Sequence, residues 1–218
     1  MCRSPTAPPL LDHNVLDRFA DALRGAAAPV AASMGPGLSE DEIRTVCAES
    51  SLVPSRDAIT WFTYWDTLPH PPTKFVEPLP GFQTASLRTC VRSTISLRRA
   101  WEEILATAPS MELTVADVYP NAWLVLFTDG GGGHTVLDCS APRQPSLLRY
   151  CFREDFAGPG WAKPISPLAA WLANGTEWMT TQSCRFDPAQ GLWLPYEEAV
   201  AYWPHFDSGK SGRRKLRS

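Results

Sequence analysis

The sequence lacks the residue patterns from which most small metal and nucleophilic sites are built. Its six cysteines include no CxxC pair, so a zinc site made of closely spaced thiolates is not expected. The four histidines include no pair at the four-residue spacing of a helical metal site. The N-terminus has no long apolar run, which predicts neither a secretion signal nor a membrane-spanning helix. We therefore expect no metal, no cofactor, no membrane contact, reduced cysteines and a cytoplasmic location.

The chain also lacks a strong charge of either sign. Its 20 lysines and arginines against 23 aspartates and glutamates give a formal net charge of −3. A dedicated nucleic-acid-binding protein normally carries a basic face, so nucleic acid is an unlikely partner. Only the end of the chain, 208–218, is basic. We interpret it as a disordered solubilising tail, with contact to nucleic acid or an acidic partner as the alternative.

Apolar residues are plentiful by contrast. They make up 44% of the 218 residues and include nine tryptophans, which is enough for a sizeable core. The composition predicts a loose segment at 1–13, a single domain at 14–207 and the basic tail at 208–218.

The stretch 122–139 is central to the predicted fold. Residues 123–127 are apolar on both faces, which is typical of a strand covered on both sides. Asp129 and the glycines after it allow the chain to turn back, and 135–139 then alternates as a second strand. A third strand is predicted at 147–153, with Arg149 and Arg153 on one face. The resulting fold class is α+β, a small antiparallel sheet with one wet face, surrounded by helices.

Apolar spacing and capping residues predict the helices. Ser39 and Glu42 form a candidate capping box. Ser96 is a candidate cap for a helix over 97–107, and Asn174-Gly175 is expected to end a helix that begins after Ser166 and Pro167. The predicted helices are 14–24, the segment after Ser39, the segment from Pro54 to Asp66, 97–107, the segment from Pro167 to Gly175, and 196–203. The proline-rich segment 68–81 is predicted to be a loop, and 182–194 a hairpin.

The sequence argues against two candidate chemical sites, a phosphate loop and a cysteine–histidine nucleophile pair. The glycine run after Asp129 has no Gly-Lys-Ser/Thr, and a strand is predicted after it in place of a helix, so we predict a hairpin turn in preference to a phosphate loop. His134 and Cys139 would point to opposite faces of a strand, so they are not expected to form a nucleophile pair. No catalytic residue is predicted.

The order of the elements resembles that of the SUKH superfamily. The features that carry this resemblance are the Ser39 helix start, the proline before the next helix, the tryptophan strand that ends in Asp129-Gly130, the strand with Leu137-Asp138, and the helix with Trp171-Leu172. The superfamily contains fungal cell-wall-assembly regulators and bacterial immunity proteins of polymorphic toxin systems. The resemblance covers about 38–175, and it implies an α+β fold, a protein-binding role and no catalytic motif.

The resemblance therefore implies a non-catalytic protein-binding domain, specifically an immunity protein that blocks a cognate toxin by steric cover, with a nuclease as one candidate for that toxin. The alternative is a regulatory scaffold without a toxin partner. An enzyme that uses the His134 region is a third and weaker reading. The candidate partner-binding residues, on the wet face and at the glycine turn, are Asp129, His134, Asp138, Arg149 and Arg153.

Overall fold

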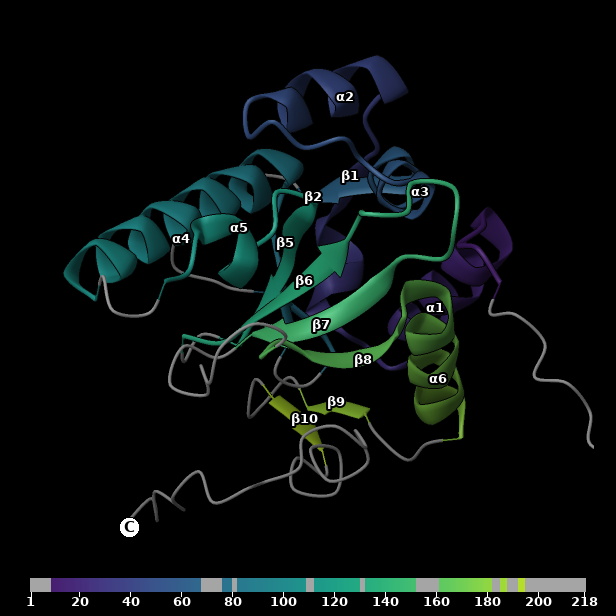
Figure 1. Ribbon diagram of the computed structural model, residues 1–218. Helices are drawn as coiled ribbons and strands as arrows, with labels where there is room; N and C mark the ends of the chain where they lie inside the picture. The colour runs from purple at the N-terminus through teal and green to yellow at the C-terminus, as the bar shows by residue number, and fades with distance from the viewer. Residues whose placement is uncertain are drawn as a thin grey trace, which may run out of the picture.

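An antiparallel sheet of six strands forms the centre of the computed structural model, which describes residues 9–67, 76–79, 82–108, 112–129, 132–151, 161–181, 185–187 and 192–194 (Figure 1). The strands lie side by side in chain order, from β3 to β8. They are β3 (Val76–Leu79), β4 (Phe82–Thr84), β5 (Trp123–Thr128), β6 (His134–Asp138), β7 (Leu147–Cys151) and β8 (Lys163–Pro167). Helices surround this sheet, so the predicted α+β class is confirmed.

The N-terminal part of the chain is mainly helical, and its caps follow from the sequence. Asp12 accepts a hydrogen bond from the Val15 N–H at 2.9 Å and starts the first helix. Ser39 and Glu42 form the predicted capping box. The elements are α1 (His13–Gly25), a 3-10 turn (Pro29–Ser33), β1 (Met34–Pro36), α2 (Glu40–Ala48), α3 (Arg56–Tyr64) and β2 (Trp65–Thr67), and β1 pairs with β2.

The remaining elements pack around the sheet. Figure 1 shows α4 and α5 on one side of the sheet, and α1 with α6 on the other. These elements are α4 (Leu87–Thr107), α5 (Val115–Val118), α6 (Leu168–Thr180), β9 (Arg185–Asp187) and β10 (Leu192–Leu194). Among the described residues, no helix is both long enough and apolar enough to cross a bilayer.

The main core is rich in aromatic rings. Phe127 of β5 contacts Trp61, Phe82 and Trp171, with ring centroids 5.8, 5.8 and 5.1 Å away. Strand β10 adds Trp193, which is fully buried in the same core. The predicted hairpin at 182–194 is thus present as the β9–β10 pair, and it contributes to the core.

A second core lies on the opposite face of the sheet. In β5, Leu124 and Leu126 belong to the main core, whereas Trp123 and Val125 pack with Trp101 and others in the second core. Strand β5 is therefore covered on both faces, as its apolar sequence predicts. The prediction of one wet face is wrong over this part of the sheet, because α4 and α5 supply apolar side chains that cover it.

Three helix boundaries differ from the prediction. Helix α4 starts at Leu87, ten residues before the predicted start, with Ser86 as its cap. Helix α3 ends at Tyr64, and the next three residues pair with β1. Helix α6 continues through Gly175 to Thr180. A Cβ at Gly175 would come within 2.9 Å of a Leu79 methyl group. That glycine permits close packing instead of ending the helix.

The proline-rich segment 68–81 contains a strand, so the prediction of a loop is wrong in part. Strand β3 (Val76–Leu79) includes Pro78 and is one of the two edge strands of the six-stranded sheet. An edge position tolerates proline because one side of the strand needs no backbone donors. The predicted helix at 196–203 and the tail at 208–218 lie outside the described residues.

Candidate functional site

The hairpin turn between β5 and β6 is held by both carboxylate oxygens of Asp129. The Gly133 N–H donates to Asp129 Oδ1 at 2.8 Å, and the Tyr150 hydroxyl donates to Oδ2 at 2.9 Å. The Asp129 N–H in turn donates to the Gly133 carbonyl at 3.1 Å. We call Asp129, Gly133 and Tyr150 the Asp129 cluster. These bonds hold the two ends of the predicted turn together.

The turn depends on glycine at two positions for different reasons. Gly132 has a φ of 103°, in the region that disfavours residues with a Cβ. At Gly133 the limit is space, because an added Cβ would overlap the Asp129 carboxylate and the Tyr150 hydroxyl. Glycine at 132 and 133 is therefore explained by the geometry of the turn.

His134 begins β6 directly after this turn and is half-buried. Burial lowers the pKa of its imidazole, and the nearby Asp129 carboxylate and a hydrogen bond involving Gly132 only partly oppose that effect. The imidazole is therefore neutral at physiological pH. A neutral ring beside a carboxylate can donate or accept one hydrogen bond at a partner surface.

Asp138 and Arg149 meet on the same face, as the strand alternation predicts. Arg149 Nε donates to Asp138 Oδ2 at 2.9 Å, and the guanidinium carbon lies 5.8 Å from the centroid of the Trp123 ring. Burial acts to raise the pKa of Asp138, but hydrogen bonds from Ser140 and the Arg149 charge outweigh it, so the pKa falls below its usual value. The pair closes the edge of the second core and is not a freely solvated surface.

The structure divides the five candidate residues into two groups. Asp129 follows the end of β5, and His134 begins β6 on the other side of the turn. The Asp138–Arg149 pair lies toward the far end of β6, and His134 and Asp138 are about 13 Å apart along an extended strand. Arg153 lies outside the described residues. The first group, with Tyr150, is the candidate partner-binding site.

The thiols near this sheet are buried and show no sign of activation. Cys139 lies in the main core, and burial raises its thiol pKa even though Ser55 hydrogen bonds act against the rise. Burial also raises the pKa of Cys47 and of Cys151 to about 12. His134 is the first residue of β6, and Cys139 comes directly after the last residue of that strand, so their side chains do not meet.

The sequence analysis did not identify Tyr150 as a site residue. The alternation of β7 places it on the face opposite Arg149, and its hydroxyl still reaches Asp129, 21 positions away in the chain. No local pattern signals such a contact. Only the β6–β7 register, with Tyr150 opposite Thr135, brings the hydroxyl to the turn.

Within the described ranges, no three histidine, cysteine, aspartate or glutamate side chains lie close enough together to hold a metal ion. Comparison of the chain with protein-family models and with curated proteins finds no match.

Proposed function

We propose that this chain is a non-catalytic protein-binding domain that acts as an immunity protein and neutralises a cognate toxin by covering its active site or a surface the toxin needs. The α+β fold is compatible with the SUKH resemblance, and the resemblance supplies the immunity role. The proposed contact surface is the β5–β6 turn with Asp129, His134 and Tyr150.

The observation that carries this proposal is the preorganisation of the Asp129 cluster. Both oxygens of Asp129 are already bonded within the chain, to the Gly133 N–H and the Tyr150 hydroxyl. A surface that is ordered before it meets its partner loses little conformational entropy on binding, which favours the tight complexes that steric inhibition requires. Tyrosine is also enriched among the residues that dominate binding energy at interfaces.

The charge of the chain favours a basic partner. A net charge of −3 gives a weak long-range attraction to a positively charged protein such as a nuclease. Attraction of this kind raises the association rate more than the final affinity, and it weakens as salt is added.

Two matched tyrosine variants test the proposed surface once a partner has been captured. Tyr150→Phe removes the hydroxyl that fixes Asp129. Tyr64→Phe removes a comparable hydrogen bond from a tyrosine hydroxyl to Asp17, 2.6 Å long, on the α1–α3 surface. We expect Tyr150→Phe to weaken the complex by about tenfold to a hundredfold, since a hydrogen bond to a charged group contributes about 1.5–3 kcal/mol. Tyr64→Phe should leave the affinity unchanged.

A growth assay of cells that produce the captured partner then shows whether that partner is a toxin. Co-production of the wild-type chain should restore growth if the partner is a toxin, and Tyr150→Phe should protect less well. A partner without toxicity would instead favour the regulatory-scaffold alternative. Equal affinities of the two tyrosine variants would remove the turn from the interface.

A further inference from the structure

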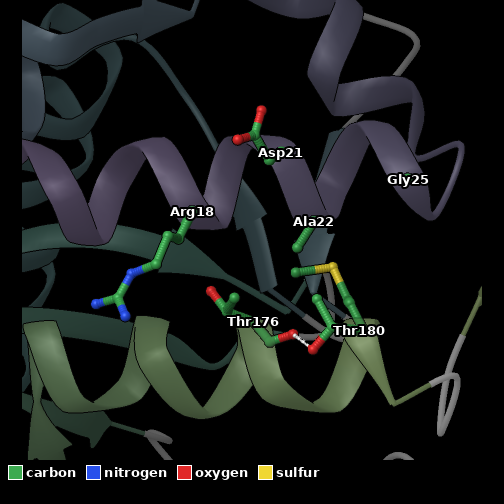
Figure 2. A pocket seen from close by; sticks show the side chains of 7 residues that line it. Arg18, Asp21, Ala22, Gly25, Thr176 and Thr180 are labelled. Carbon is green, nitrogen blue, oxygen red and sulfur yellow. Dashed lines mark hydrogen bonds between the residues drawn. The ribbon is translucent and has the colours of Figure 1, made fainter.

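Helices α1 and α6 lie side by side, and a groove runs along the seam between them (Figure 2). A hollow of about 490 Å³ is lined in part by Ala22, Gly25 and Met179, and a second hollow of about 210 Å³ by Val15 and Ala173. Both hollows share Arg18, Thr176 and Thr180, so they form one groove. It extends from Val15 to Gly25, which is about 15 Å of helix.

The charges along this groove are of two kinds. Asp21 forms an ion pair with Arg24 on its own helix, and Figure 2 shows its carboxylate pointing away from α6. Arg18 points across toward α6, and its Nε donates only to the Asn14 carbonyl at 3.3 Å. Glu177 of α6 lines the same small hollow as Arg18. Within the described residues, neither Arg18 nor Glu177 has an ion-pair partner.

We infer that this face, the α1–α6 groove with Arg18 and Glu177, is a two-fold interface between two copies of the chain. A two-fold interface is self-complementary: if one residue contacts a second residue on the other copy, the second residue also contacts the first, so each contact away from the axis occurs twice. One exposed cation and one exposed anion on the same face satisfy this rule. Arg18 of each copy pairs with Glu177 of the other, around small residues that allow the helices to approach closely.

The size of the face sets the expected strength. Each helix has 13 residues and is thus about 20 Å long, so two adjacent helices present a face of roughly 400 Å² in projection. This is about half of the roughly 800 Å² that each partner of a standard specific interface buries, so the face falls in the range of weak, transient contacts. The association is therefore weak, reversible and sensitive to salt. The inference of a dimer does not depend on the proposed immunity function.

Charge reversal with cross-rescue tests this inference. Sedimentation of the full chain over a micromolar concentration range should show an equilibrium between one and two copies. Arg18→Glu alone and Glu177→Arg alone each place two like-charge pairs in the interface and should raise the dimer dissociation constant by about tenfold or more. An equimolar mixture of the two single variants restores two opposite-charge pairs, and so does the double variant. Both should recover association.

The matched control is Arg99→Glu on α4, an exposed position whose substitution changes the net charge as Arg18→Glu does. It should leave the dimer unaffected. Circular dichroism should verify that each variant is folded, and Arg18→Gln with Glu177→Gln provides a milder pair if a reversal does not fold. A single copy at every concentration, or a dimer that ignores both single reversals, would overturn the inference.

Discussion

The Ser146 N–H donates a 2.7 Å hydrogen bond to Oδ2 of Asp57, which joins positions 89 residues apart in the chain. The other oxygen of the same carboxylate accepts the Leu11 N–H at 2.9 Å. Asp57 is fully buried, so this one side chain ties the segment before α1 and the β6–β7 connection to the start of α3. Leu11 is itself buried, although the sequence predicts a loose segment over 1–13.

Removal of this carboxylate should destabilise the fold. Asp57→Ala leaves two buried backbone N–H groups without an acceptor, and each such loss costs about 1–3 kcal/mol. We expect the free energy of unfolding, measured in urea, to fall by about 2–4 kcal/mol. Asp57→Asn keeps one acceptor oxygen and should lose less than Asp57→Ala. Equal stability of the wild type and Asp57→Ala would show that these bonds do not support the fold.

The C-terminal hairpin should contribute to global stability. Trp193 is fully buried in the main core, with its ring 5.8 Å from that of Phe186. Trp193→Ala should lower the free energy of unfolding by about 3–5 kcal/mol. The control is Val53→Ala, because Val53 is 64% exposed and its loss should change stability by less than about 0.5 kcal/mol. A small effect at both positions would mean that the hairpin folds apart from the core.

Gly133 in the β5–β6 turn and Gly25 at the end of α1 allow a direct comparison of the space available for a Cβ. A Cβ at Gly133 overlaps the Asp129 cluster, whereas a Cβ at Gly25 meets nothing within 4 Å. Gly133→Ala should therefore lower the thermal midpoint, by the equivalent of about 1–3 kcal/mol. Gly25→Ala should be neutral or stabilise by up to about 1 kcal/mol. The reverse order of the two midpoints would contradict the geometry of the turn.

His134 should make the stability depend on pH in a predictable direction. Burial depresses the pKa of the folded state below the unfolded value, which is near 6.5 for histidine. The unfolded chain then binds the extra proton first. The contribution of His134 is thus fully present above about pH 6.5 and is lost as the pH falls through the lower folded pKa.

The difference in thermal midpoint between the wild type and His134→Gln isolates this contribution, because the other titrating groups are the same in both chains. The wild-type midpoint should fall faster than that of His134→Gln as the pH decreases below about 6.5. Parallel curves would mean that His134 titrates normally.

Much of the fold follows from local patterns. The Ser39–Glu42 capping box follows directly from short-range spacing and is confirmed. Strand alternation places Asp138 and Arg149 on one face, and the structure adds that they form an ion pair there. The predictions that were wrong concerned residues whose contacts are far away in the sequence. Gly175 has the appearance of a helix end, but it lies against Leu79, a residue 96 positions earlier that no local pattern connects to it.

The candidate site shows the same division. Asp129 and His134 are conspicuous beside a glycine run, and the alternation of β6 and β7 indicated a wet face. Helices α4 and α5 cover much of that face, and their packing position cannot be derived from strand periodicity. The Tyr150–Asp129 bond required the register between β6 and β7, which the sequence does not specify.

The most direct test of the central proposal is capture of the partner from native cells with the tagged chain, followed by identification and quantification of what is retained. We predict one stoichiometric protein that carries a nuclease or other toxin domain, retained by the wild type and by Tyr64→Phe and reduced with Tyr150→Phe. Several non-toxin proteins, or none, would contradict the immunity function.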